Sequence, residues 1–591
     1  MHKLLLFFLL LGLILPRAHA QTGAPRAVTG VVTAASDTSP LPGVTVVVKN
    51  TTNGATTNGD GRFTLQAAPG TVLVFSFIGY TSQERTVEAS GEISVSLRES
   101  AQQLQEAVVT GYGIKEEQAK INYAVQVVKS KDIIESRQPN VVNALQGKVA
   151  GVQVTSSGGA PGEGASIVIR GGASLDSDNQ PLFVIDGIIM DNSSFVESTA
   201  PGGGSGFNGI LGRTAASTNR AGDLNPENIE SMTVLKGPAA SAIYGLRAAN
   251  GAVVITTKKG TKGVTTLNYR TQFSVDEVNR LPKLQDQYKQ GSLGLFDTGV
   301  RSSWGPRFQP GETVYDNLGN FFQTGKTWQH YLTMSGGSEK GTFFVSASRL
   351  DQTGVAPTSA YDKTTARLSG TFQFSPKLSA SGSVEYLNSG ARTPLQGPGL
   401  YQGAGGYLLS ILNWPLNDDA RNYLNPDGSV RRLLGAAQAG TDADNPYFQV
   451  YRNPQTTRTN RMLGNVQLGF KATDWLNFSY NIGNDFYFQK DRSVRAVGTT
   501  QPSNQNGGIS ESDIFNQLIT SNLLATLTHS FSDNFSGSLV VGNTVEYQHR
   551  ETTDNLGLIF QNPSFTSINN TVNRNVLITT QDRRLIGNFA A

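Results

Sequence analysis

Residues 264–275 read VTTLNYRTQFSV, and apolar and polar side chains alternate along this stretch. In an extended chain Leu267, Tyr269 and Phe273 point to one face, and Arg270 points to the other with the polar residues around it. A strand of about ten residues with this period of two is what a tilted strand needs to cross a bilayer with one face toward lipid. The stretch therefore predicts a membrane-crossing β-strand.

The alternation returns along the remainder of the chain, at residues 366–374, 378–386, 466–470, 476–482, 523–531 and 539–547. Aromatic residues gather toward the ends of these segments, as in the aromatic girdles of outer-membrane barrels. Examples are Trp328, Trp475 and Tyr547. An array of soluble β-sandwiches would alternate in the same way and is the alternative interpretation. The long strands and the very long loops between them favour an antiparallel transmembrane β-barrel over residues 264–591.

The N-terminus has the three parts of a secretory signal peptide. Lys3 supplies a positive charge, residues 4–15 form an apolar run, and Ala18-His19-Ala20 gives the small-x-small pattern of a cleavage site. We expect residues 1–20 to be removed on export. Beyond residue 20 no apolar run reaches the roughly 18 residues that a membrane-spanning helix needs.

Composition excludes several classes of protein. The chain has no cysteine, which removes disulfides and thiolate chemistry. Its formal net charge of +3 is nearly balanced, so no nucleic-acid partner is expected. No zinc-ligand cluster or Ser/His/Asp arrangement is visible, and the G-x-G-x-x-G letters at residues 204–209 lack the strand and helix that a nucleotide site requires. We expect no enzymatic activity, catalytic residue, metal site or cofactor.

Two regions precede the barrel segments. Residues 27–98 contain short strand candidates separated by turns, which predicts a small β-sandwich. Residues 118–260 mix strand patterns with helical ones, because residues 141–149 have helical spacing and residues 239–249 are rich in helix formers. This region is predicted to be an α+β domain, and the chain as a whole to be mainly β.

A short segment lies between these two regions, at residues 106–113, and reads EAVVTGYG. Its valines favour an extended backbone, so the segment is suited to add as a strand to the sheet edge of a partner. A plain linker is the alternative interpretation of this segment when it is considered alone.

Seven motifs follow in order within residues 118–260: VIRGG at 168–172, PLFVIDG at 181–187, LNPENIES at 224–231, VLKGP at 234–238, AIYG at 242–245, RAANG at 247–251 and ITTK at 255–258. In its residues and their spacing this series resembles the plug domain of the SusC/RagA family of TonB-linked outer-membrane proteins. One departure is Lys236-Gly237-Pro238, where most SusC-like plugs are expected to have an acidic residue after the lysine.

The resemblance implies a domain organisation. Residues 27–98 would be a carboxypeptidase-regulatory-like β-sandwich, residues 106–113 would carry the TonB box, and residues 118–260 would be the plug. Residues 264–591 would be the N-terminal, incomplete part of the transmembrane barrel. About ten strand candidates cannot close around a plug of this size, since plugged lumens occur in barrels of about 22 strands. We therefore expect the chain to be a fragment or a truncated reading frame.

The resemblance also implies a function and the residues that carry it. Family members import glycan oligomers or peptides across the outer membrane of Bacteroidota, with TonB (energised by ExbB/ExbD) and a SusD-like surface lipoprotein as partners and outer-membrane lipid around the barrel. The TonB-box candidates are Val108, Val109, Thr110, Gly111, Tyr112 and Gly113. The plug-motif candidates are Arg170, Gly171, Asp186, Gly187, Lys236, Tyr244, Gly245, Asn250 and Gly251.

Two points stay open at the level of sequence. Arg170 and Asp186 are candidates for ion pairs within the plug or with the barrel wall, and ordinary turn or surface residues are the alternative. For the whole protein, a surface adhesin or structural β-protein without transport is the alternative function, although an adhesin has no use for a plug or a TonB box.

Overall fold

A computed structural model describes residues 26–49, 51, 53–77, 79–88, 91–98, 107–109, 115–117, 124–156, 159–172, 179–193, 219–394, 406–434, 444–499, 506–532 and 535–590. The predicted signal peptide and residues 110–113 of the TonB-box candidate lie outside the described residues. The chain divides into two compact units, one formed by Met1–Ala107 with Glu117–Ala119 and the other by Val108–Glu116 with Lys120–Ala591.

The first unit is a β-sandwich. A three-stranded sheet has the order β4-β1-β7 and a four-stranded sheet has the order β3-β2-β5-β6. Alternating residues of both sheets form its core, in which the rings of Phe63 and Phe75 meet edge to face at 5.4 Å. The strands are β1 (Arg26–Ala34), β2 (Thr45–Val48), β3 (Gly54–Thr56), β4 (Arg62–Ala67), β5 (Val72–Ser76), β6 (Gln83–Thr86) and β7 (Glu92–Leu97).

The plug region of the second unit is α+β, as the sequence predicts. Its main sheet has the order β10-β15-β16-β13-β14, with β13 parallel to β16 and the other pairs antiparallel, and a separate hairpin pairs β11 with β12. The strands are β10 (Val125–Lys129), β11 (Val152–Ser156), β12 (Ala165–Ile169), β13 (Leu182–Ile185), β14 (Ile188–Met190), β15 (Ile229–Leu235) and β16 (Ala252–Thr257). Short helices α2 (Ser130–Glu135) and α4 (Pro238–Tyr244) pack around them.

Two helical expectations in this region are wrong in extent. Residues 141–149 form only the 3-10 turn η3 (Asn143–Leu145), and positive φ angles at Gly147 (73°) and Gly151 (70°) prevent a longer helix. The helix expected over residues 239–249 ends at Tyr244, because Gly245 has a φ of 71°, and the 3-10 turn η6 (Gly245–Ala248) follows.

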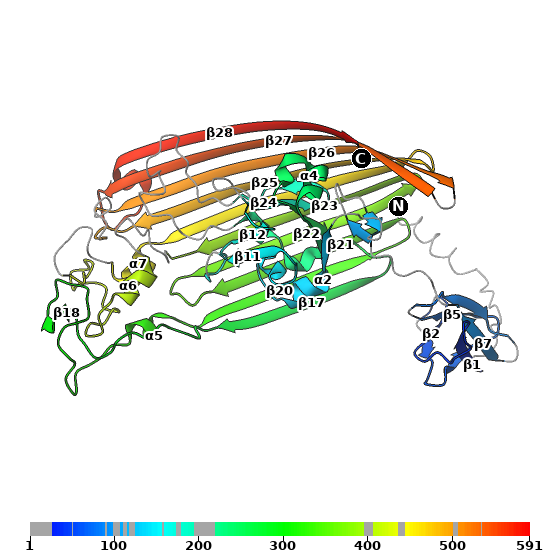
Figure 1. Cartoon of the computed structure of the whole chain (residues 1–591), viewed down its shortest axis with the longest axis horizontal. Helices are drawn as coiled ribbons and strands as arrows, with labels where there is room; N and C mark the ends of the chain where they lie inside the picture. Colours follow the sequence, from blue (N-terminus) through cyan, green and yellow to red (C-terminus); the bar gives the residue numbers. More distant parts are fainter. Residues whose placement is uncertain are drawn as a thin grey trace, which may run out of the picture. The chain divides into compact units, whose positions relative to one another are not determined.

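A ten-stranded antiparallel sheet makes up the rest of the unit, with β17 and β28 at its edges (Figure 1). Its strands are β17 (Gly263–Asp276), β20 (Gly325–Gly337), β21 (Gly341–Thr353), β22 (Ala360–Ser375), β23 (Leu378–Arg392), β24 (Gln455–Lys471), β25 (Leu476–Arg495), β26 (Gly508–Ser532), β27 (Phe535–Phe560) and β28 (Thr571–Ala590). Every strand pairs with its neighbours in an unbroken antiparallel register, apart from small shifts near the turns.

The connections at the two ends of this sheet differ in length. Residues 338–340 and 376–377 make tight turns at one end, whereas residues 277–324 and 393–454 make long loops at the other. Outer-membrane barrels have short periplasmic turns and long extracellular loops. The short-turn end therefore corresponds to the periplasmic side and the long-loop end to the outside.

The long loops carry structure of their own. They contain the small hairpin of β18 (Gly291–Ser292) and β19 (Leu295–Phe296), with helices α5 (Asn317–Phe321), α6 (Tyr407–Leu412) and α7 (Pro446–Arg452). Phe321, Tyr407, Trp414 and Tyr447 belong to one apolar cluster among these helices. In the described part of the chain, no helix is long and apolar enough to cross a membrane.

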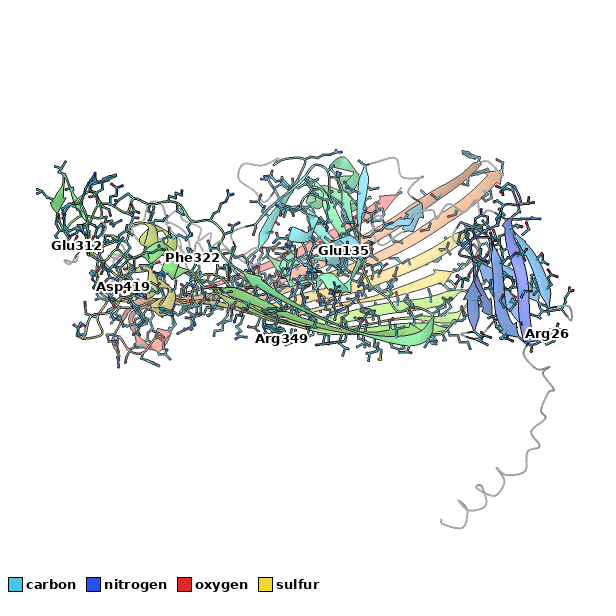
Figure 2. The ribbon with its side chains drawn as sticks, turned by 90° about the horizontal axis from the view of Figure 1, so that it is seen from below. Arg26, Glu135, Glu312, Phe322, Arg349 and Asp419 are labelled. Carbon is cyan, nitrogen blue, oxygen red and sulfur yellow. The ribbon has the colours of Figure 1, made fainter. Side chains whose placement is uncertain are left out.

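The two faces of the large sheet have opposite character, as the alternation predicts. The outer face exposes apolar side chains, for example Leu368 (54%), Phe372 (47%) and Leu468 (43%). The inner face buries charged residues such as Arg367 and Arg461. Figure 2 shows the plug region, in which Glu135 is labelled, over the inner face, and Arg349 on the face that points away from it. This arrangement confirms the predicted fold class of a plug domain with part of an antiparallel barrel.

A charge placed on the outer face should be costly. We expect Leu368→Arg to lower the free energy of unfolding in lipid vesicles by about 2–4 kcal/mol. Leu368 lies on the outer face of β22, which meets the hydrocarbon of the bilayer. The control Gln373→Arg changes the inner face of the same strand and should cost much less. Urea titration of the protein in vesicles measures both variants. Equal losses on the two faces would contradict the assignment of the outer face to lipid.

Candidate functional site

The turn between β13 and β14 brings a carboxylate to the inner face of the ten-stranded sheet. This sheet is called the wall from here on. Asp186 and Gly187 connect the strands with φ angles of 48° and 85°, the pattern of a type I′ hairpin that the Asp-Gly sequence favours. Inward side chains of the wall hold this tip. Asn481 Nδ2 donates to the Asp186 carbonyl at 3.1 Å, and Asn522 Nδ2 donates to the Gly187 carbonyl at 3.1 Å. The hairpin therefore ends directly on β25 and β26.

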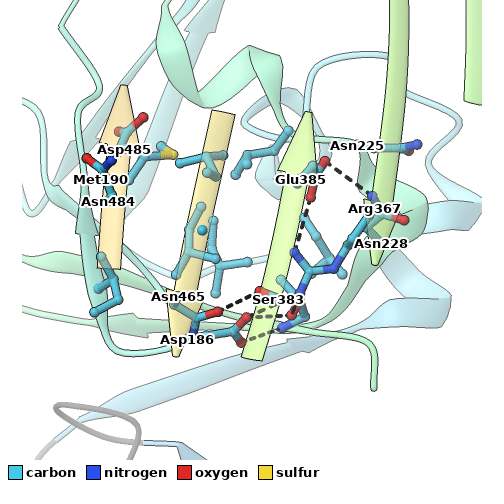
Figure 3. Close-up of a pocket in the computed structure, with 18 of the residues that line it drawn as sticks. Asp186, Met190, Asn225, Asn228, Arg367, Ser383, Glu385, Asn465, Asn484 and Asp485 are labelled. Atoms are coloured by element: carbon cyan, nitrogen blue, oxygen red, sulfur yellow. Dashed lines mark hydrogen bonds and ion pairs between the residues drawn. The ribbon is translucent and has the colours of Figure 1, made fainter. Parts of the chain in front are cut away.

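A buried ion cluster, called here the Arg367 cluster, joins the same turn to β22 and β23. Arg367 Nη1 lies 3.3 Å from Glu385 Oε2 on the neighbouring strand, and Nη2 lies 3.5 Å from Asp186 Oδ2 on the plug. Arg367 Nη2 also donates to Thr257 Oγ1 at 2.5 Å, and the Thr257 backbone N–H donates to Asp186 Oδ1 at 3.0 Å. These contacts surround the small cavity drawn in Figure 3. One guanidinium thus connects the wall to the plug.

A second buried cluster, the Arg461 cluster, lies on β24 and β25. Arg461 forms a two-pronged bond with Asp485 of the wall, at 2.8 Å from Nε and 2.7 Å from Nη2. Arg461 Nη1 also donates to Asp223 Oδ2 of the plug at 2.9 Å. The same guanidinium donates to the carbonyls of Arg220 and Asp191, at 2.9 and 3.0 Å. Arg461 therefore binds two plug segments that lie on either side of residues 194–218.

Contacts with an aromatic ring extend this cluster. Tyr487 on β25 donates its hydroxyl to Asp191 Oδ2 at 2.7 Å, and the Arg220 guanidinium lies 5.5 Å from the centre of its ring. Arg220 also donates to Thr459 Oγ1 at 3.0 Å and pairs with Asp223 at 3.4 Å. Plug and wall thus share a continuous network of polar contacts here.

β22 and two further strands, β20 and β21, bind the plug through uncharged acceptors. Lys363 on β22 is buried and donates from Nζ to the carbonyls of Gly222 and Leu224, at 3.1 and 3.3 Å. Asn228 accepts hydrogen bonds from Tyr331 on β20 at 3.0 Å and from Ser346 on β21 at 2.7 Å. The wall therefore holds residues 220–228 of the plug from β20 to β24.

The other predicted plug residues lie within the plug itself. Arg170 is exposed, with a φ of 60°, and its guanidinium lies beside Gly237, where an added Cβ would be 3.2 Å from Nη1. Lys236 Nζ donates to Gln126 Oε1 at 3.3 Å, which joins the end of β15 to the neighbouring strand β10. The unusual Lys236-Gly237-Pro238 sequence thus borders Arg170.

The last group of predicted residues shapes turns and core. Tyr244 is buried in an apolar cluster, and Asn250 lies half-buried in the turn before β16. Gly171, Gly245 and Gly251 all have positive φ angles, of 93°, 71° and 94°. A Cβ at Gly251 would lie 2.8 Å from Ile169, so only glycine fits there. These positions support the plug, whereas Asp186 and Gly187 are the predicted residues that contact the wall.

The charged residues that hold the plug to the wall, Arg461, Asp485, Asp223, Arg220, Lys363 and Glu385, were not predicted from the sequence. One signal was available. A charge at an inward position of an alternating strand, such as Arg461, must meet a partner, since buried charges are paired. The partner itself cannot be named from the pattern.

A polar cavity of about 320 Å³ opens between the plug and the long-loop end of β21 and β22. Amide and carboxyl groups line it, together with the aromatic ring of Tyr361. Burial raises the pKa of the Glu163 carboxyl in this lining to about 7, so the group can both donate and accept hydrogen bonds near neutral pH. Such a lining suits a ligand with many hydroxyl or amide groups.

The TonB-box candidate is described in part. Val108 and Val109 belong to β8 (Ala107–Val109), which pairs with β9 (Lys115–Glu117) in a two-stranded sheet. Thr110, Gly111, Tyr112 and Gly113 lie outside the described residues. A strand in a two-stranded sheet has one edge through which a partner strand can add. The extended backbone of β8 is therefore suited to strand addition by TonB, as expected for a TonB box.

Comparisons with known proteins agree with this architecture. Residues 28–109 match the CarboxypepD_reg-like domain, and residues 117–252 match the TonB-dependent Receptor Plug Domain. TonB-dependent receptor SusC of Bacteroides thetaiotaomicron is 32% identical over 455 residues, which cover 73% of this chain and 41% of that protein. TonB-dependent receptor P39 of Formosa agariphila is 34% identical over 365 residues, covering 60% of this chain and 32% of that protein.

Among solved structures, the RagAB peptide importer in its open-open state has a similar fold. Its TM-score is 0.62 at 21% identity, and the match covers 82% of this chain and 53% of that chain. The chain spans less than half the length of the two curated relatives, at 41% and 32%.

Proposed function

This chain belongs to the SusC/RagA-type TonB-dependent receptors of the outer membrane, and from that premise we propose that it takes part in energy-coupled import of a glycan oligomer or a peptide. One observation carries the proposal. A plug is fastened to the inner face of a membrane-crossing sheet, and a segment suited to strand addition precedes it in the chain. A plugged wall needs an outside source of work to open, and TonB, energised by ExbB/ExbD, supplies that work.

The chemistry of the outer cavity favours a glycan as cargo. Asn140, Asn143 and Gln352 offer amide groups, and Tyr361 offers a ring face, at the long-loop end where cargo arrives. Amides, carboxyls and aromatic faces together suit the hydroxyl groups and apolar ring faces of sugars. A peptide is the second candidate, since the similar RagAB structure is that of a peptide importer.

A SusD-like surface lipoprotein is the proposed partner at the long-loop end. The β18–β19 hairpin exposes Leu293 (96%), Leu295 (72%) and Phe296 (55%), and Trp304 beside it is 61% exposed. Leu293 also has a φ of 53°, a strained conformation for this residue. Strain and apolar exposure at one loop tip support a docking surface for a partner protein.

The proposed function predicts energy-dependent uptake. Cells that express the receptor from its own gene are given labelled neutral oligosaccharides and, separately, labelled peptides. We expect uptake of an oligosaccharide to fall to background when a protonophore removes the proton gradient, because the plug then stays closed, while binding at the cell surface persists. A strain without the gene is the control. Uptake that resists the protonophore, or that is equal in the deletion strain, would exclude this function.

A further inference from the structure

Three cavities lie along the same neighbouring strands of the wall. The outer cavity, of about 320 Å³, reaches Gln352 of β21 and Tyr361 of β22 at the long-loop end. A middle cavity of about 40 Å³ is lined by Arg367 of β22, Glu385 of β23 and residues of β24. An inner cavity of about 470 Å³ is lined by later residues of β22 and by β23 and β24 at the short-turn end. The three cavities follow one line from outside to periplasm.

The middle cavity is the smallest of the three. Its volume of about 40 Å³ compares with about 320 and 470 Å³ on its two sides. The Arg367 cluster closes it, because Asp186 and Thr257 reach the wall from the plug and meet the guanidinium of Arg367 there. Figure 3 shows the side chains of Asp186 and Arg367 meeting at this cavity.

The wall changes character below this cluster. Between the row of Arg367 and Glu385 and the short-turn end, a charge stands at an inward position of β22–β24 only where β24 ends, at Lys471, and the other inward positions carry short or amide side chains. They are Ser369, Thr371, Gln373, Ser379, Ser381, Ser383, Asn465, Gln467 and Gly469. Thr371, Ser381 and Gln467 are direct neighbours across the three strands, so this lining is continuous.

Above the cluster the same face is charged. Lys363 and Arg461 are the charged inward residues of β22–β24 toward the long-loop end, among uncharged ones such as Thr365 and Ser389, and both bind the plug. The two charged residues toward the long-loop end therefore hold the plug, whereas the residues of β22–β24 that line the inner cavity are uncharged. Lys262, Glu339 and Lys340 line the same cavity at the short-turn end. Hydroxyl and amide groups without a fixed charge suit an uncharged polar cargo that must bind weakly and move on.

We propose that cargo crosses the receptor along the inner face of β22–β24, and that the contact of Asp186 and Thr257 with Arg367, at the smallest of the three cavities, is the gate of this route. The inference rests on the proposed function. Removing the β13–β14 turn from the wall joins the middle cavity to the cavities on both sides. Arg367 keeps its wall partner Glu385 when the turn leaves, so opening exposes no unpaired cation.

The route is tested by placing single cysteines in this cysteine-free chain. Ser381→Cys lies on the route, and the matched control Ser538→Cys lies on the inner face of β27, away from it. Uptake of the labelled oligosaccharide that wild-type cells import is measured before and after treatment with sulfonatoethyl methanethiosulfonate, which attaches a bulky anion. We expect treatment to remove most uptake in Ser381→Cys and little in Ser538→Cys.

The outcomes separate the route from the function. Equal block at both positions, or block at Ser538→Cys alone, overturns the route while the proposed function stands. If wild-type cells import no oligosaccharide or peptide at all, the proposed function fails and the route fails with it. Should Ser381→Cys not reach the outer membrane, Ser379→Cys on the same face of β23 replaces it.

The gate has a readout that needs no cargo. Arg367→Gln should admit vancomycin, which intact outer membranes exclude because of its size, and so should lower the growth-inhibiting concentration of the drug. The control Arg349→Gln removes an arginine from the outer face of β21, where it pairs with Asp362 at 3.4 Å, and should leave resistance unchanged. Unchanged resistance in Arg367→Gln, or an equal drop in both variants, overturns the gate.

Discussion

Val109→Pro should abolish energy-dependent import while leaving cargo binding at the cell surface intact. Val109 lies in β8, which precedes the plug in the chain, so a pull on this strand is transmitted into the plug. Strand addition uses backbone hydrogen bonds, and proline removes the N–H donor of its position. Uptake and surface binding of a labelled oligosaccharide, measured on the same cells, report the two effects separately.

The matched control for this prediction is Val109→Ile. It keeps the donor and the preference for an extended backbone, so import should be nearly unchanged. Normal import by Val109→Pro cells would show that residues 106–113 are only a linker, and the coupling site would then lie elsewhere. A loss of surface binding as well as import would point instead to misfolding of the receptor.

The sheet could be predicted from the sequence because each strand carries its own evidence. The alternation depends only on the period of two, and β22 follows it, because Leu368 (54%) and Phe372 (47%) are exposed while Arg367 between them is buried. The prediction of a helix over residues 141–149 was wrong because the pattern of the segment does not show its backbone angles. Its apolar spacing is real, but Gly147 and Gly151 adopt positive φ angles that spacing does not reveal.

The site was only partly predictable. Asp186 belongs to an Asp-Gly turn that can be recognised in the sequence. If its carboxylate is buried, it needs a charged or hydrogen-bonding partner. That partner, Arg367, follows 181 residues later on another domain. Arg461 and Asp223 are separated by 238 residues. Pairings over such separations are set by the register of the sheet and the placement of the plug, which no single segment encodes.

The two clusters share a feature that bears on release of the plug. Arg367 pairs with Glu385 of the wall as well as with the plug, and Arg461 pairs with Asp485 of the wall in the same way. Removing one partner of a buried ion pair costs about 3–5 kcal/mol when it leaves a charge uncompensated. Because each arginine retains a wall carboxylate, plug movement avoids most of that cost. Both arginines would therefore stay paired if the plug left the wall.

Release of the plug requires the β13–β14 hairpin to leave the wall, and a disulfide can prevent that movement. Ile188 of the hairpin packs against Gly483 of β25, where an added Cβ would lie 2.6 Å from the side chain of Ile188. The paired substitutions Ile188→Cys and Gly483→Cys should therefore bring two thiols within disulfide range. We expect the oxidised double variant to lose import completely and to regain it when a reductant opens the bond, with surface binding unaffected in both states.

Two controls accompany the disulfide experiment. Ile188→Cys alone tests the loss of the isoleucine, and the pair Thr526→Cys with Val540→Cys joins two neighbouring strands of the wall without touching the hairpin. Both controls should import equally with and without reductant. If the oxidised Ile188–Gly483 pair still imports, the hairpin stays on the wall throughout transport. The Arg367 cluster would then be a permanent fastening, and the moving part of the plug would have to lie among the segments held by Arg461 and Lys363.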